Sequence, residues 1–157
     1  MIQHLRVGIP LVGGSVWMGG VSYIELLVRA VRSLPDNARP RLFLIIRDKQ
    51  TESLSYYQSF IKEFDGILYV ADQPLPAHIL TWALEVCCCK NEDELFDHLD
   101  LYFPAVFDAI PGRKAVSWIP DFQHRILPEM FTPHERSMRD EQLDKISRFA
   151  RIVVVSS

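Results

Sequence analysis

The hydrophobic residues of this 157-residue chain follow two alternating patterns. Continuous apolar runs are typical of strands covered on both faces of a sheet. They lie at residues 5–12, 41–47, 67–71, 114–119 and 151–157. A weaker strand is predicted at 101–107, because Pro104 interrupts that run.

Helices are predicted between these strands. Val21, Ile24 and Val28 recur at spacings of three and four, which places them on one helix face. Start signals such as Pro76, and Asn91 with Glu94 three residues later, indicate further helices. The predicted helices cover residues 19–34, 51–64, 77–88, 91–100 and 134–150.

Strands that alternate with helices along the whole chain predict an α/β fold. We expect a Rossmann-like open parallel sheet with helices on both faces. The length of 157 residues suits one domain, so residues 1–157 are interpreted as a single domain. The final strand reaches the last residue, which suggests a chain that was cut at a buried strand.

Composition narrows the class of protein. A net charge of −3 and a pI near 5.9 give no indication of nucleic-acid binding. No apolar run approaches the length of a membrane span, and the N-terminus lacks a convincing signal peptide, so we expect a cytoplasmic protein. Residues 1–50 hold seven Lys or Arg against three Asp or Glu. This excess could favour an anionic ligand, although a solvated surface explains it more simply.

The three cysteines are adjacent, at Cys87, Cys88 and Cys89. Neighbouring side chains point in different directions, so the three cannot surround one metal ion without distant partners. An odd, clustered set is also a poor disulfide framework. We therefore interpret the thiols as small apolar side chains in a reducing compartment, and expect no metal site.

The loop at residues 12–20 joins the first predicted strand to the first helix and holds Gly13, Gly14, Gly19 and Gly20. Glycines let a ligand approach the backbone, and a helix N-terminus attracts phosphate. The loop matches neither the dinucleotide fingerprint nor the P-loop. It is a candidate phosphate site, and the alternative is a tight turn without a ligand.

Asp121 and His124 follow the predicted strand at 114–119. In parallel sheets, ligands bind beyond the carboxyl ends of the strands. Asp121 could accept hydrogen bonds from sugar hydroxyls, and His124 could exchange hydrogen bonds with a hydroxyl near neutral pH. The alternative for His124 is a hydrogen bond to the backbone of its proline-rich loop. No nucleophile elbow of the G-x-S-x-G type is present.

Two stretches resemble a known family. One matching stretch runs from Gly19-Gly20-Val21 to Leu27. The more specific match is residues 118–157, which include Pro-Asp-Phe-Gln-His. On these stretches the chain resembles the N-terminal half of retaining glycosyltransferases with the GT-B fold, family 4 (glycosyl transferases group 1). Residues 35–113 carry little of the family's signature.

The resemblance implies an enzyme with two Rossmann-like halves that transfers a sugar from a nucleotide sugar to an acceptor hydroxyl with retention. It implies that His124 contacts the donor sugar, that the four glycines lie near the diphosphate, and that Asp121 belongs to the same motif. No metal or other cofactor is implied. The nucleotide-binding C-terminal half is absent from these residues, so we expect the chain alone to be inactive.

A missing half would expose the face that normally meets it. We expect Trp17, Phe122 and Met130 on that face, and some self-association. Location at the inner face of a membrane is compatible with the family. Two other hypotheses stay open: a stand-alone flavodoxin-like module that binds a phosphorylated ligand at the glycine loop, and an interaction domain whose loops are merely turns.

Overall fold

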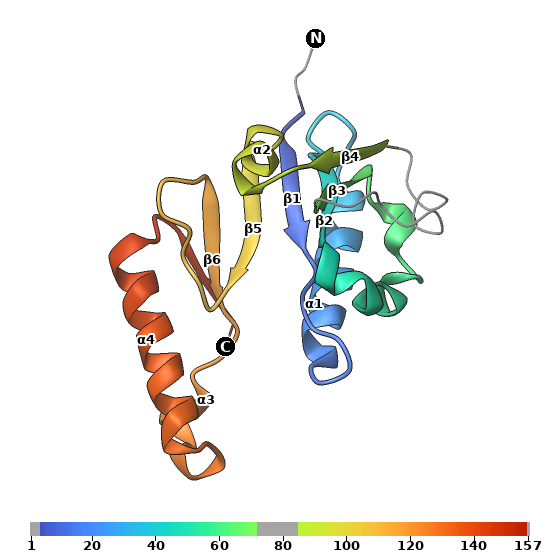
Figure 1. The fold of residues 1–157 in the computed structure, drawn as a ribbon. Helices are drawn as coiled ribbons and strands as arrows, with labels where there is room; N and C mark the ends of the chain where they lie inside the picture. The colour runs from blue at the N-terminus through green and yellow to red at the C-terminus, as the bar shows by residue number, and fades with distance from the viewer. Residues whose placement is uncertain (1–3, 72–84, 157) are drawn as a thin grey trace. The chain divides into compact units, whose positions relative to one another are not determined.

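The structure, a computed structural model, describes residues 4–71 and 85–156. The chain divides into two compact units, Met1–Leu101 and Tyr102–Ser157. The helices and strands of the two units are labelled in Figure 1. The expectation of one domain over residues 1–157 stays a prediction.

The first unit is a parallel four-stranded sheet with helices on both faces. Its strands follow the order β4-β3-β2-β1, and each neighbouring pair is parallel. Its elements are β1 (Arg6–Pro10), α1 (Met18–Arg32), β2 (Arg41–Arg47), the 3₁₀ helices η1 (Asp48–Tyr57) and η2 (Ile61–Glu63), β3 (Gly66–Val70), β4 (Glu85–Cys89) and α2 (Glu92–Asp97).

Strand register separates the two faces of this sheet. Ile46 pairs with Tyr69, whose hydroxyl donates to Asp48 of η1 at 2.9 Å. Because α1 contacts η1 and η2, these helices share the Tyr69 face. The opposite face carries Ile45, and a Cβ placed on Gly8 would meet both Ile45 and Leu99 there. Leu99 follows α2, so α2 covers this second face.

The prediction of the first helix is confirmed, with bounds shifted by one or two residues. Val21, Ile24 and Val28 are buried on the sheet side of α1. The strands predicted at 5–12, 41–47 and 67–71 correspond to β1, β2 and β3. The helix predicted at 91–100 is confirmed over Glu92–Asp97, where the Asn91 side chain caps it by accepting from the Glu94 N–H at 2.9 Å.

Two helix predictions in the first unit need correction. The helix predicted at 51–64 is a pair of 3₁₀ helices. Its buried residues Leu54, Tyr57 and Phe60 lie three apart, which is the period of a 3₁₀ helix. The helix predicted at 77–88 falls mostly outside the described residues. Its end is wrong, because residues 85–89 form β4 beside β3.

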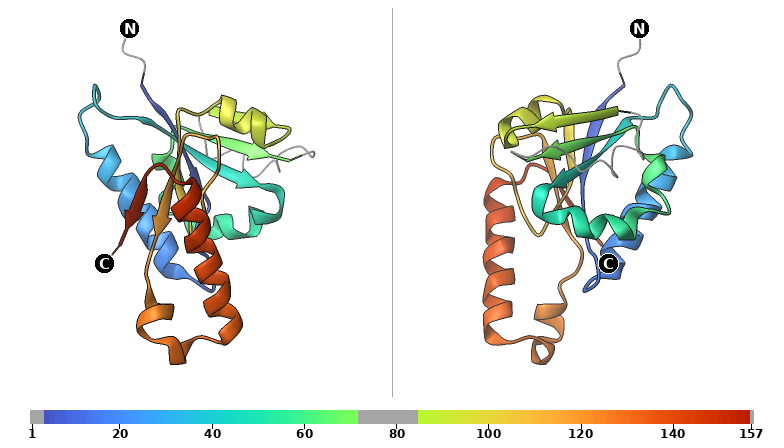
Figure 2. Two further views of the ribbon diagram at one scale, coloured as in Figure 1. Left: turned by 90° about the vertical axis from the view of Figure 1, so that its left-hand side faces the viewer. Right: turned by 45° about the vertical axis from the view of Figure 1, so that its right-hand side comes forward.

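The second unit contains three parallel strands in the order β5-β6-β7. Its helix α4 runs alongside these strands, and α3 contacts α4 (Figure 2). One buried cluster in the core of this unit contains Ala109, Ile119, Leu143 and Ile146. Its elements are β5 (Leu101–Val106), β6 (Ala115–Ile119), α3 (Gln123–Ile126), η3 (Pro128–Met130), α4 (Pro133–Phe149) and β7 (Val153–Val155).

Helix α4 starts one residue before its predicted range and has a complete capping box. Thr132 Oγ1 accepts from the Glu135 N–H at 3.2 Å, and the Glu135 carboxylate accepts from the Thr132 N–H at 2.8 Å. Two expectations are wrong in this unit. The segment after β6 holds two short helices instead of a plain loop, and the side chains of β7 are exposed rather than buried.

The fold class is confirmed. All strand pairs within the two units are parallel, and helices pack on the strands, as in Rossmann-like open sheets.

Candidate functional site

The glycine loop is a tight turn closed by Trp17. Gly13 and Gly14 adopt positive φ angles of 79° and 148°, which favour glycine. The Gly14 carbonyl accepts from the Trp17 N–H at 3.1 Å, and the Trp17 carbonyl accepts from the Gly20 N–H at 3.3 Å. The loop therefore brings the chain back on itself just before α1 begins.

Close packing explains two of the four glycines. A Cβ at Gly13 would lie 2.4 Å from the Trp17 carbonyl oxygen, and one at Gly20 would lie 2.8 Å from the Trp17 ring. A Cβ at Gly14 would meet no atom nearer than 3.8 Å. Gly13 and Gly20 thus make room for Trp17, which the sequence interpretation did not anticipate.

Tyr57 fixes the chain between β1 and the loop. The Val12 N–H donates to the Tyr57 hydroxyl at 2.7 Å, and that hydroxyl donates to the Val12 carbonyl at 2.8 Å. The Tyr57 side chain is fully buried, and burial raises its pKa to about 12. One hydroxyl therefore satisfies both backbone groups of Val12, where the ladder of β1 has ended.

Asp121 is held in place by neighbours in the second unit. Its Oδ1 accepts from the Gln123 N–H at 3.0 Å, at the start of α3, and from Arg139 Nη1 of α4 at 2.9 Å. The Arg139 guanidinium also lies over the rings of Phe107 and Phe131, 5.1 Å and 4.7 Å from their centroids. Asp121 thus ties α3 to α4 through one well-packed arginine.

His124 lies in α3 and is only 2% exposed. Neither of its ring nitrogens has a hydrogen-bond partner among the described residues. Its Nε2 is 3.4 Å from Asp140 Oδ1, a close approach without hydrogen-bond geometry. The Phe131 ring stands edge-on at 6.4 Å between centroids. The predicted alternative, a hydrogen bond from His124 to the loop backbone, is not present.

Asp140 connects His124 to a second arginine. Arg125 Nη2 donates to Asp140 Oδ1 at 2.7 Å, and this bond is the main reason that the pKa of Asp140 lies below its usual range. Asp140 is therefore an anion at neutral pH. It presents negative charge to the His124 ring from the exposed side of α4.

Asp121 and His124 belong to one group in the second unit, which we call the α3–α4 cluster: Asp121, His124, Arg125, Phe131, Arg139 and Asp140. The four glycines belong to the first unit. Sequence reasoning missed Arg139 and Asp140. They are an adjacent basic and acidic residue in a helix that holds many charged residues, so nothing in the sequence distinguished them.

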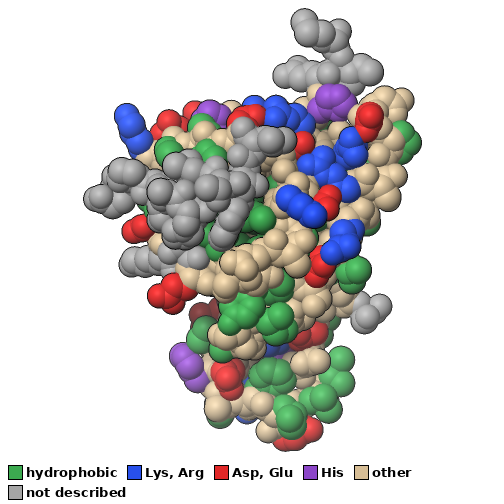
Figure 3. All heavy atoms as spheres, turned by 90° about the vertical axis from the view of Figure 1, so that its right-hand side faces the viewer, with side chains coloured by type: hydrophobic (Ala, Val, Ile, Leu, Met, Phe, Trp, Pro, Cys, Tyr) green, Lys and Arg blue, Asp and Glu red, His purple; other side chains and the backbone are tan. Residues whose placement is uncertain are grey.

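The basic excess of residues 1–50 is balanced by ion pairs. Arg6 and Arg41 both reach Glu85, and Arg32 pairs with Asp65 at 3.1 Å. Basic and acidic side chains alternate on the face shown in Figure 3. The simpler interpretation, a solvated and paired surface, therefore accounts for these arginines.

Two of the three side chains predicted on an exposed face are themselves exposed. Met130 is 73% exposed and Trp17 is 36% exposed, and their sharing one face stays a prediction. Phe122, by contrast, packs against the core of the second unit. Self-association stays a prediction. None of the described helices is long and apolar enough to cross a membrane.

Comparisons of the chain with family models, with curated proteins and with solved structures find no match. The glycosyltransferase resemblance therefore rests on sequence motifs, to which the structure adds a compatible fold.

Proposed function

We propose that the chain forms the N-terminal, acceptor-side part of a retaining glycosyltransferase with the GT-B fold. The enzyme would transfer a sugar from a nucleotide sugar to an acceptor hydroxyl in the cytoplasm. The observation that carries this proposal is the position and burial of His124. This residue lies in α3, the short helix that follows the carboxyl end of β6, is buried, and has two ring nitrogens without a hydrogen-bond partner among the described residues.

A buried polar group without a partner is costly, so proteins retain few of them without a reason. A donor hydroxyl that bonds to His124 would supply the missing partner. The ring is 2% exposed, so the hydroxyl reaches it only if α3 shifts away from α4. Helix α3 has four residues, and the Arg125–Asp140 ion pair that joins it to α4 is exposed. An exposed pair contributes only about 0–1 kcal/mol, so breaking it in a small movement of α3 costs little.

In this proposal His124 positions the donor sugar and is not a base. Retaining transfer develops positive charge on the sugar ring and negative charge on the leaving diphosphate. Asp140 beside His124 supplies negative charge on the sugar side. When His124 holds the donor sugar in the reactive orientation, the rate of sugar transfer rises.

The alternative of a stand-alone phosphate-binding module is less well supported. The Trp17 ring occupies the space beside Gly20, and the Gly20 N–H already donates to the Trp17 carbonyl. This part of the loop is therefore packed around its own side chain.

The proposal is tested by a screen of nucleotide sugars against the product of the complete reading frame. Thermal stabilisation identifies the donor, and mass spectrometry with NMR of the product identifies a transferred sugar whose anomeric configuration is retained. The same assay on residues 1–157 alone is expected to give no turnover. Inversion, or hydrolysis of a phosphorylated ligand without transfer, would overturn the proposal.

A further inference from the structure

Strand alternation brings two of the three cysteines to one face of the sheet. In β4, Cys87 pairs with Leu68 and Cys89 with Val70, whereas Cys88 pairs with Tyr69 on the other face. Successive side chains of a strand point to opposite faces, so Cys87 and Cys89 lie together and Cys88 points away. Cys89 is buried, Cys87 is half-buried and Cys88 is exposed.

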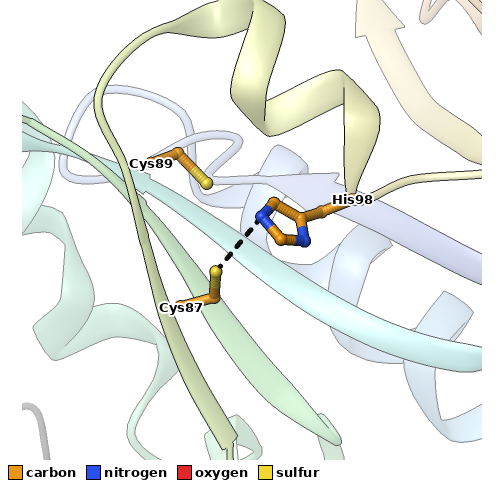
Figure 4. Close-up of side chains that lie close together, drawn as sticks. All are labelled: Cys87, Cys89 and His98. Carbon is orange, nitrogen blue, oxygen red and sulfur yellow. Dashed lines mark hydrogen bonds between the residues drawn. The ribbon is translucent and has the colours of Figure 1, made fainter.

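His98 approaches the same face from α2. This residue is the C-cap directly after α2, and α2 contacts β3 and β4. The backbone at His98 is fixed against β1, because Arg6 Nε donates to the His98 carbonyl at 2.8 Å and the Arg6 N–H donates to Asp100 Oδ2 at 2.8 Å. The imidazole is thereby directed toward the two sulfur atoms, as Figure 4 shows.

The three ligand atoms have the spacing of a metal site. They lie within 4.8 Å of one another, and Cys87 Sγ is 3.4 Å from His98 Nε2. With Zn–S bonds of about 2.3 Å and a Zn–N bond of about 2.0 Å, tetrahedral angles place sulfur and nitrogen about 3.5 Å apart. Little movement would be needed to place an ion between them.

We propose that Cys87, Cys89 and His98 form a binding site for Zn²⁺, with a water molecule in the fourth position. Two sulfur ligands and one imidazole favour a thiophilic ion over Mg²⁺ or Ca²⁺. Zinc displaces the protons of the two thiols, which pass to solvent. The site joins edge strand β4 to α2 and needs neither the glycine loop nor the α3–α4 cluster, so it stands independently of the proposed function.

Burial and the neighbouring Cys87 raise the pKa of the Cys89 thiol to about 12. Without a cation this thiol is therefore protonated at neutral pH. The competing interpretation is that the three side chains pack against one another without a metal ion, and that Cys87 and His98 are hydrogen-bonded.

Titration of the reduced 157-residue chain with Co²⁺, followed by displacement with Zn²⁺, decides between these interpretations. One equivalent of Co²⁺ is expected to give thiolate charge-transfer absorption and the visible bands of a tetrahedral site. Cys87→Ser, Cys89→Ser and His98→Gln are each expected to weaken binding by about 100-fold or more, because each removes a ligand. Cys88→Ser is the matched control and should bind as the unaltered chain does.

A second measurement needs no variant. Zinc should protect the half-buried Cys87 from alkylation in the unaltered chain, while the exposed Cys88 reacts at the same rate with and without the metal. Absence of the charge-transfer band in the unaltered chain would overturn the proposal. Equal loss of binding in Cys88→Ser, or no difference in alkylation on adding zinc, would do the same.

Discussion

Replacement of Tyr57 by phenylalanine tests how the end of β1 is held. The substitution removes one buried hydroxyl and keeps the ring, which is fully buried. Both hydrogen bonds to Val12, at 2.7 Å and 2.8 Å, are lost together. Val12 is 5% exposed, so its N–H and carbonyl have little access to water as a substitute.

The magnitude follows from these two groups. A buried backbone donor or acceptor without a partner costs about 1–3 kcal/mol, so Tyr57→Phe should lower the free energy of unfolding by about 2–4 kcal/mol. Tyr56→Phe is the matched control, because Tyr56 is 37% exposed and its change should stay within about 0.5 kcal/mol.

Urea denaturation followed by circular dichroism measures the difference. Hydrogen exchange adds a local readout, since the Val12 amide should exchange roughly 30-fold faster or more when 2 kcal/mol of protection is lost. Equal effects of Tyr57→Phe and Tyr56→Phe, with unchanged exchange at Val12, would refute the reasoning.

Three further predictions follow from single groups. The folded pKa of Tyr57, about 12, lies above its ordinary value of 10, so the unfolded chain loses this proton first. The stability that Tyr57 contributes is then retained below pH 10 and lost between pH 10 and 12, by roughly 3 kcal/mol at most, and Tyr57→Phe should remove that part of the decline in alkaline urea titrations. Gly13→Ala should cost at least about 2 kcal/mol more than Gly112→Ala in thermal unfolding. Both positions have positive φ, but only Gly13 has an atom within 4 Å of the new Cβ, so equal losses would contradict this. Thr132→Ala should lower the free energy of unfolding by about 1 kcal/mol, because it removes the N-cap of α4. The exposed Ser137→Ala is the control and should not lower it. A loss in Thr132→Ala no greater than that in Ser137→Ala would count against a role of the cap.

Much of the fold could be predicted because its strands are continuous apolar runs. Strand β2 was predicted with its observed bounds, 41–47, because a run of Leu, Phe and Ile between two arginines is typical of a buried strand. Helix α1 was predicted because three buried residues repeat at the helical period. In both cases the local pattern and the packing agree.

The errors have local causes. The segment at 51–64 was predicted as one helix, whereas its buried Leu54, Tyr57 and Phe60 lie three apart, a period that fits the 3₁₀ helices observed. The sequence at β4 mixes Glu, Val and three cysteines, and Pro76 ahead of it suggested a helix. That error also concealed the relation of Cys87 to Cys89, because residues two apart share a face only in a strand.

The candidate site was found in part. Asp121 and His124 were selected by their position after a strand, and both lie in the α3–α4 cluster. Their partners Arg139 and Asp140 come from a helix in which charged residues are frequent, so nothing in the sequence distinguished them. The role of Trp17 could not be foreseen, because which glycine a ring contacts depends on the backbone path.

The most direct test of the account compares His124→Gln with His134→Gln in the complete gene product. His124 is buried, while His134 is exposed at the start of α4 and serves as the control. Initial rates of sugar transfer are measured with the donor found in the screen, after both variants are shown to unfold at temperatures similar to that of the unaltered enzyme. The account predicts that His124→Gln lowers kcat/KM by about 100-fold through lost positioning, and that His134→Gln leaves it unchanged. Equal rates in both variants, or no transfer from any nucleotide sugar by the unaltered protein, would contradict it.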